Sequence, residues 1–68
     1  RQGMVTLLDG GGEVRTLEDI ERDLLRYAIA HYRGNMTEVA RRVGIGRSTL
    51  YRRIKELGLD EQVPAAAE

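Results

Sequence analysis

The sequence contains no cysteine, no tryptophan and no phenylalanine, and it has one histidine among its 68 residues. Because cysteine is absent, disulfides and thiolate metal sites are excluded, and one histidine cannot complete a zinc site or a Ser-His-Asp relay unaided. No carboxylate pair, metal-binding cluster or nucleophile–base pair is apparent, so we expect no enzymatic activity, no metal and no cofactor. The three tyrosines are too few for an aromatic base-stacking platform.

Long hydrophobic runs are also missing. No apolar segment approaches the roughly 20 residues of a membrane span, and no signal peptide is visible, so we expect no membrane partner. A chain of 68 residues allows one small domain, which buries only about 60% of the surface that its unfolded chain exposes. We therefore expect the core to need a partner. The chain begins with Arg1 and not with methionine, from which we expect a fragment of a longer protein.

The sequence has no net charge, because 11 basic and 11 acidic residues cancel. The charges are nevertheless segregated along the chain: residues 13–32 sum to −2, residues 33–55 to +6 and residues 56–68 to −4. Local charge, more than net charge, sets the field that a nearby polyanion meets. The basic block of residues 33–55 therefore predicts a surface for nucleic acid.

Both ends of the chain lack a helical pattern. Residues 1–15 contain three adjacent glycines, which predict a linker or flexible lead-in. Because apolar residues lie on either side of these glycines, a marginal hairpin is an alternative for this segment. Residues 60–68 carry no periodic pattern, so we expect a disordered C-terminal tail. The predicted folded domain is the region between, residues 16–59.

Three helical patterns fill residues 16–59, and no strand pattern interrupts them. The first predicted helix is capped by Thr16 and stops at Gly34, and the second is capped by Asn35 and stops at Gly44. The third begins after Gly46 and stops at Gly58. The sequence therefore predicts an all-α domain of three helices, of which the first is the longest.

The first predicted helix carries two adjacent apolar stripes, which together are wider than one face of a surface helix. Both stripes could bury against the other two helices, but those helices are short and offer few apolar partners. We therefore predict a homodimer through the first helix. The predicted interface residues are Leu17, Ile20, Leu24, Leu25, Ile29 and Tyr32.

The second and third predicted helices form a helix-turn-helix pattern. Ala40 lies four residues before Gly44, where a small side chain lets the two helices cross closely, and Gly44 supplies the positive φ of the turn. Ile45 is expected to plug the corner from inside, while Leu50 and Ile54 fix the third helix to the second. The outer face of the third helix is then free to enter a DNA major groove.

Residues 34–54, GNMTEVARRVGIGRSTLYRRI, resemble the Fis-type helix-turn-helix. They are most similar to the version at the C-terminus of sigma-54-dependent transcription activators, the bacterial enhancer-binding proteins of the NtrC class. Residues 17–22, LEDIER, resemble that family's long first helix, so the resemblance covers roughly residues 16–59.

The resemblance implies a long dimerisation helix followed by a helix-turn-helix, and homodimeric binding of double-stranded DNA at enhancer sites. It also implies a bacterial, cytoplasmic and nucleoid-associated protein. An AAA+ ATPase domain and contacts with sigma-54 RNA polymerase would belong to parent domains that are absent here.

The resemblance also implies roles for individual residues. In Fis-type proteins the third helix is the recognition helix, and its positions that touch DNA correspond to Arg47, Thr49 and Arg52. Positions at the start of the second helix that contact phosphates correspond to Asn35 and Thr37. Gly46 matches a position that is polar in Fis, and its backbone N–H can still meet a phosphate. On a helical wheel Ser48 lies with Arg52 on the side of the third helix opposite its apolar stripe. The predicted base-reading residues are therefore Arg47, Ser48, Thr49 and Arg52, and the predicted phosphate contacts are Asn35, Thr37, Gly46, Arg53 and Lys55.

Three other functions stay open at this point. A free-standing Fis-like architectural protein or the DNA-binding end of a recombinase would carry the same motif. A dimerisation or protein-interaction module without a DNA role would use the same helices, although the basic block argues against it. The absent initiator methionine and the glycine-rich lead-in favour a domain of an activator.

Overall fold

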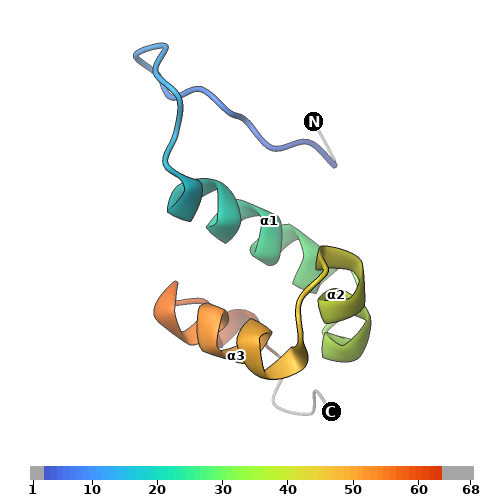
Figure 1. Ribbon diagram of the computed structural model, residues 1–68. Coiled ribbons are helices and arrows are strands. Elements are labelled where there is room, and N and C mark those ends of the chain that lie inside the picture. Colours follow the sequence, from blue (N-terminus) through green and yellow to red (C-terminus); the bar gives the residue numbers. More distant parts are fainter. Residues whose placement is uncertain (1–2, 64–68) are drawn as a thin grey trace.

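The computed structural model describes residues 3–63, and these fold into three α-helices and one short 3-10 turn (Figure 1). The helices are α1 (Leu17–His31), α2 (Met36–Val43) and α3 (Arg47–Glu56), and the 3-10 turn η1 spans Asp60–Gln62. α3 runs beneath α1, and α2 stands at the C-terminal end of α1 (Figure 1). The prediction of an all-α domain of three helices is confirmed. Within residues 3–63 no helix has both the length and the apolar character needed to cross a membrane.

Side-chain caps and one glycine set the helix boundaries where the sequence predicts them. Thr16 accepts a hydrogen bond from the backbone N–H of Asp19 at 3.0 Å, and Asn35 accepts one from the N–H of Glu38 at 3.2 Å. Gly44 closes α2 with a φ of 87°, and its N–H donates back into the last turn of that helix. These contacts satisfy backbone groups that a helix end leaves without partners, so the boundaries follow from local chemistry.

One apolar core holds the three helices together. Leu25 and Ile29 of α1 are buried in it with Leu50 and Ile54 of α3, and Ile45 of the turn packs against it as predicted. The buried members are Leu25, Ala28, Ile29, Met36, Val39, Ala40, Leu50, Ile54, Leu57 and Leu59. Among the described residues no polar or charged side chain is buried. The transfer of apolar surface out of water, about 25 cal/mol per Å², is therefore the main force that holds the domain together.

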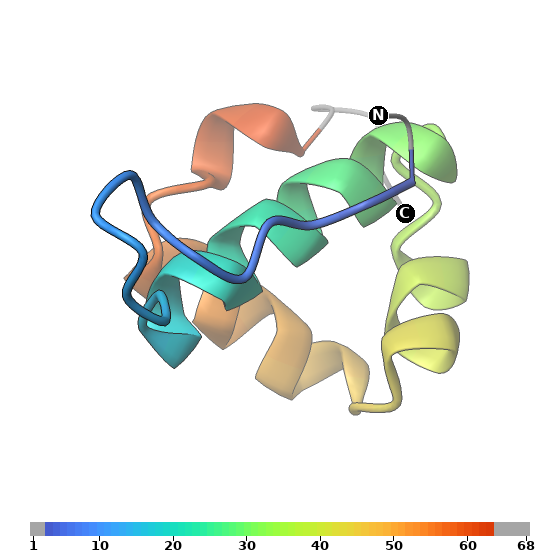
Figure 2. The ribbon, with the colours of Figure 1, turned by 90° about the horizontal axis from the view of Figure 1, so that it is seen from above.

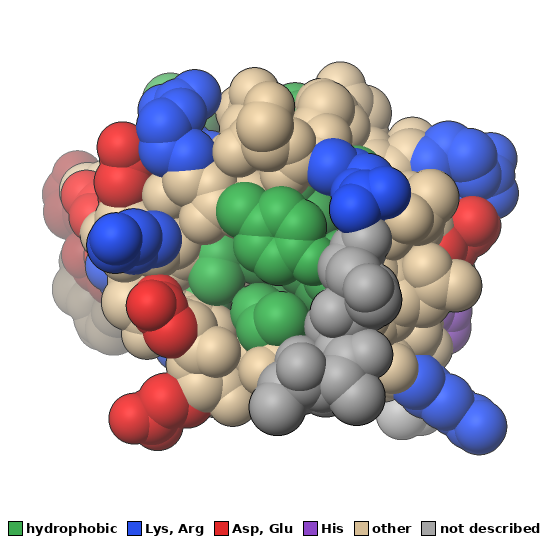
Figure 3. All heavy atoms as spheres, turned by 90° about the horizontal axis from the view of Figure 1, so that it is seen from below, with side chains coloured by type: hydrophobic (Ala, Val, Ile, Leu, Met, Phe, Trp, Pro, Cys, Tyr) green, Lys and Arg blue, Asp and Glu red, His purple; other side chains and the backbone are tan. Residues whose placement is uncertain are grey.

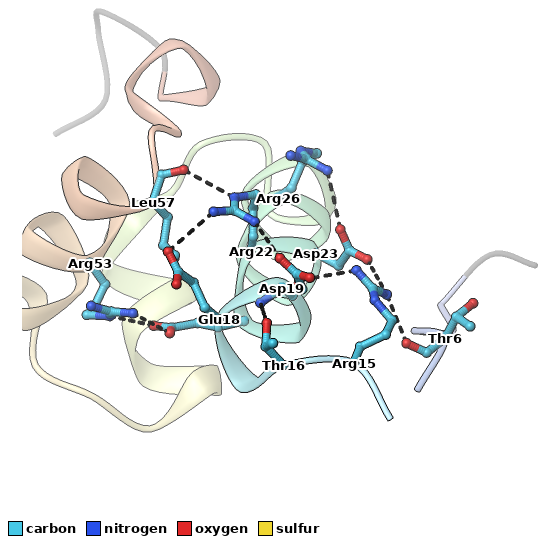
Figure 4. Close-up of polar contacts among 11 residues, drawn as sticks. Thr6, Arg15, Thr16, Glu18, Asp19, Arg22, Asp23, Arg26, Arg53 and Leu57 are labelled. Atoms are coloured by element: carbon cyan, nitrogen blue, oxygen red, sulfur yellow. Dashed lines mark hydrogen bonds and ion pairs between the residues drawn. The ribbon is translucent and has the colours of Figure 1, made fainter. Parts of the chain in front are cut away.

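The lead-in before α1 forms a tight turn that is attached to α1. Leu8 and Val14 make an isolated antiparallel bridge, and the segment crosses over α1 (Figure 2). At the base of this turn Arg15 donates to the Thr6 carbonyl at 2.9 Å and pairs with Asp23 of α1 at 2.8 Å (Figure 4). The hairpin that the sequence left as a possibility is thus present as a single bridge. Arg15 connects its two sides with each other and with α1.

The chain after α3 differs from the expected disordered tail in its first residues. Gly58 turns the backbone with a φ of 73°, and the next residue, Leu59, is buried in the core. η1 follows, and Val63 packs against the core behind it. Burial of these two apolar side chains is the physical reason for the order. The rest of the predicted tail, residues 64–68, and the first two residues of the lead-in lie outside the described residues.

Side chains of α1 and α3 form what we call the α1–α3 clamp, which consists of Glu21, Arg22, Arg53, Glu56 and Leu57. Arg53 donates to both carboxylate oxygens of Glu21, at 2.8 Å from Nε and 2.6 Å from Nη2, and it also pairs with Glu56. Arg22 donates from Nε to the Leu57 carbonyl at 3.3 Å, at the C-terminal end of α3 (Figure 4). The clamp therefore joins the first half of α1 to the last half of α3.

The turn between α2 and α3 should be most stable with glycine at its first position, Gly44. A Cβ at Gly44 meets nothing within 4 Å, so the cost of Gly44→Ala comes from the positive φ alone. We expect a loss of about 1–2 kcal/mol in the free energy of unfolding, measured by urea denaturation. Gly10→Ala is the control, because its Cβ is equally unhindered and its φ is not left-handed. Equal stabilities of the two variants would contradict this account.

Acid should weaken the α1–α3 clamp. Hydrogen bonds from Arg53 lower the pKa of Glu21 below its ordinary value of 4.5, against a smaller effect of desolvation. Because the folded pKa is the lower one, this stabilisation is complete above the unfolded pKa and is lost as the pH falls through the folded pKa. We expect Glu21→Gln to show a weaker pH dependence of unfolding than the unmodified chain between about pH 3 and 5. Parallel stability curves for the two proteins would refute the assignment.

Candidate nucleic-acid interface

The basic block lies on α2, the turn and α3, below α1. Seen from this side, Lys and Arg side chains stand around the edge of the face, and acidic side chains gather mainly towards one side (Figure 3). Hydrophobic side chains gather near the centre of the face (Figure 3). Tyr51, Ile54 and Val63 line a shallow hollow beside α3. The basic side chains that lie away from the acidic ones suit a polyanion on that part of the face.

The start of α3 is exposed and has no side-chain cap. Gly46 occupies the N-cap position, and Arg47 and Ser48 follow it on the surface. The first N–H groups of a helix have no partner within the helix, and they carry the positive end of its dipole. Such a helix start is suited to a phosphate oxygen.

The four predicted base-reading residues lie on the first two turns of α3. Arg47, Ser48 and Arg52 are exposed, whereas Thr49 is half-buried. Ser48 and Arg52 are four residues apart and therefore lie one above the other on the outward side. Arg52 makes a loose ion pair with Glu56 at 3.7 Å. Exposed pairs of this kind contribute at most about 1 kcal/mol, so its guanidinium can leave that carboxylate for a better partner.

The start of α2 is the second exposed helix start on this side of the molecule. Asn35 and Thr37 are both exposed there, and the cap uses only the side-chain oxygen of Asn35, not its NH₂ group. Glu38, in the first turn, pairs with Arg41. The hydrogen bond between them lowers the pKa of Glu38 and raises the pKa of Arg41. This pair offsets the one negative charge that would face a phosphate at the start of α2.

The two remaining phosphate candidates, Lys55 and Arg53, have different surroundings. Lys55 is exposed and lines the shallow hollow of α3. Arg53 is 29% exposed and points from α3 towards α1 (Figure 4). The carboxylates of Glu21 and Glu56 pair with its guanidinium. The structure therefore brings Lys55 to the open face and turns Arg53 away from it.

Two of the six residues predicted for a dimer interface belong to the domain's own core. Leu25 and Ile29 are 2% and 3% exposed, so they have no surface to offer a second chain. The reason is that α2 and α3, although short, cover this stripe of α1 together with Leu57 and Leu59. Tyr32 is half-buried against the same core. These findings correct the predicted interface.

An apolar row remains on the outer side of α1, and we call it the α1 seam: Leu17, Ile20, Leu24 and Tyr27. Leu17, Leu24 and Tyr27 are 85%, 43% and 39% exposed, and Ile20 is half-buried. Spacings of three and four residues place all of them in one row, as in a coiled-coil heptad. The sequence-based prediction omitted Tyr27, which that heptad spacing could have found.

Comparisons with known proteins cover the same three helices. The model of the family "Bacterial regulatory protein, Fis family" matches residues 16–57. The DNA-binding transcriptional regulator NtrC of Escherichia coli K12 is 48% identical over 42 residues, which are 62% of this chain and 9% of NtrC. The DNA-binding protein Fis of Aliivibrio fischeri is 39% identical over 44 residues, which are 65% of this chain and 45% of Fis. No solved structure gives a significant match.

The matched residues are those that build α1, α2 and α3, so sequence family and structure describe the same unit. Because the matched region is only 9% of NtrC and 45% of Fis, the similarity concerns this domain and not a whole regulator. The chain belongs to the Fis family of bacterial regulatory proteins, and residues 16–57 are its non-catalytic, DNA-binding helix-turn-helix domain.

Proposed function

We propose that the chain binds double-stranded DNA sequence-specifically as a homodimer, as the enhancer-binding end of a sigma-54-dependent transcriptional regulator. The observation that carries this proposal is the exposed and uncapped start of α3, with Arg47 and Ser48 upon it. The 48% identity to the regulator NtrC supports the regulatory role. An ATPase domain and contacts with sigma-54 polymerase belong to other parts of such a regulator. Its place of action is the nucleoid in the bacterial cytoplasm.

In this proposal α3 enters the major groove of the DNA. The groove is about 12 Å wide and admits one helix, and the apolar side of α3 is already buried in the core. Arg47 and Arg52 each carry a guanidinium fork, which fits O6 and N7 of guanine with two hydrogen bonds. Thr37 and the N–H at Gly46 meet phosphates, which set the register of the helix but carry no sequence information.

The homodimer forms through the α1 seam. Leu17, Leu24 and Tyr27 leave a row of large apolar side chains in water, and pairing of two such rows would bury both. A domain of this size has a marginal core, so the additional burial also stabilises each subunit. The seam residues of α1 are distinct from the outward residues of α3, so in this proposal pairing through the seam leaves both recognition helices open to DNA.

A second candidate function is that of a free-standing, Fis-like DNA-binding protein. The 39% identity to Fis favours it, because Fis matches over the same helices as NtrC. Both candidates bind DNA through α3. They differ in whether the domain is attached to an ATPase, which the sequence of the full-length gene product would decide.

Reading of bases and contact with phosphates should be separable by mutation. Arg47→Ala should cost about 1–3 kcal/mol on the preferred duplex and relax discrimination at one base pair, because a bidentate contact is lost. Thr37→Ala should weaken preferred and random duplexes alike. Fluorescence anisotropy titrations with both duplexes measure the difference. Uniform weakening by Arg47→Ala, together with altered base preference in Thr37→Ala, would show that the proposed orientation of α3 is wrong.

The α1 seam should determine the oligomeric state. We expect sedimentation equilibrium at micromolar concentration to give twice the chain mass, and Leu24→Lys to shift the mass towards that of one chain. Ala30→Lys is the control, because it adds the same charge to another exposed face of α1. A mass of one chain at high concentration, or equal effects of both substitutions, would contradict dimerisation through the seam.

A further inference from the structure

Two adjacent residues of α1, Glu21 and Arg22, both reach the C-terminal half of α3 in the α1–α3 clamp. The partners of each contact are more than 30 residues apart in the sequence, and both contacts are partly shielded from water. The pairs of Arg41 with Glu38 and of Arg26 with Asp23 each lie within one helix, and the pair of Arg15 with Asp23 joins the lead-in to α1. The clamp differs from these pairs because it links two α-helices.

The charges of the clamp argue against a role in phosphate binding. Glu21 and Glu56 together bring two carboxylates to the single guanidinium of Arg53. A phosphate that approached Arg53 would therefore have to displace carboxylates that already occupy its guanidinium. The hydrogen bonds with Glu21 raise the pKa of Arg53 and lower the pKa of Glu21, so both groups stay charged near neutral pH.

The contacts of the clamp are suited to fixing the angle between α1 and α3. Apolar core contacts are less directional than hydrogen bonds, and helix packing alone leaves a scatter of about 15–20° in the angle between two helices. A guanidinium that donates two parallel hydrogen bonds to one carboxylate has a narrow range of orientations. The hydrogen bond from Arg22 to the Leu57 carbonyl adds a second fixed point at the end of α3.

We propose that Glu21 and Arg53 are positioning residues that fix the angle between α1 and α3, and thereby the half-site spacing that the dimer accepts. α1 carries the dimer seam and α3 reads the bases, so any rotation between them changes the separation of the two recognition helices. The inference rests on the proposed function, because it requires both the dimer through α1 and DNA binding through α3.

The test uses the full 68-residue chain and duplexes with two identical half-sites, chosen by selection with the unmodified protein. The separation of the half-sites is varied one base pair at a time, and the ratio of affinities between the best and the neighbouring spacings is measured. The variants are Glu21→Gln, Arg53→Gln and the two combined. Glu38→Gln is the matched control, because its carboxylate also pairs with an arginine but within α2. Circular dichroism shows that each variant is folded at the temperature of measurement.

We expect each clamp variant to lower the spacing ratio by about threefold or more, and the double variant to lose no more than either single one, because all three break one link. Glu38 lies beside the proposed phosphate contacts of α2, so Glu38→Gln should change the affinity equally at every spacing and keep the ratio of the unmodified protein. An unchanged ratio in the clamp variants, or equal loss of affinity at every spacing, would overturn the inference.

The two clamp variants should also act in the same direction. If Arg53 were a phosphate contact, Glu21→Gln would free it and tighten binding at every spacing. In that case Arg53→Gln would weaken binding and reduce the salt slope by about 1. Opposite effects of this kind would overturn the inference while the proposed function stands. Failure of the unmodified protein to bind any duplex would instead refute the proposed function.

Discussion

Burial of one side of α3 beneath α1 and α2 is the constraint on which the rest of the structure depends. Leu50 and Ile54 complete a core to which residues 3–63 contribute ten buried side chains, and in so small a domain each contributes a large share of the stability. The same burial turns the opposite side of α3 outward. The side chains that fold the domain and those that face DNA therefore share one short helix, and the first group orients the second.

The arginines of the basic block do not serve one purpose. Arg47 and Arg52 are exposed on the outward turns of α3, Arg41 pairs with a carboxylate of its own helix, and Arg53 joins α3 to α1. Arg53 is set apart by its two acidic partners, Glu21 and Glu56, because a guanidinium held by two carboxylates offers little to a phosphate. The block sums to +6 in the sequence, but the charge available to a partner is smaller than that sum.

α1 has two apolar sides with different fates. One side, with Leu25 and Ile29, is covered by α2, α3 and the residues after α3. The other side is the α1 seam, which remains exposed although the lead-in crosses over α1 (Figure 2). A helix with one covered and one exposed apolar side can hold a domain together and still present a surface to a second copy. In the proposed dimer α1 is therefore the element through which each recognition helix is related to its partner.

The sequence by itself determined the three helices and their boundaries, because these depend on neighbouring residues: Thr16 and Asn35 as caps, and Gly44 as the left-handed stop. It also placed Leu50 and Ile54 on the inner side of α3, since helical periodicity alone requires it. The outward position of Ser48 and Arg52 followed from the same periodicity.

Only the tertiary structure decided what depends on residues distant in the chain. A wheel of α1 shows two apolar stripes but not which one the short helices cover, so Leu25 and Ile29 were assigned to an interface although they lie in the core. Likewise Arg53 is a basic residue on the flank of α3 in the sequence, and it is Glu21, 32 positions earlier, that turns it towards α1. Local chemistry fixes where a helix begins and ends, but which charges and apolar faces meet is decided by how the helices pack.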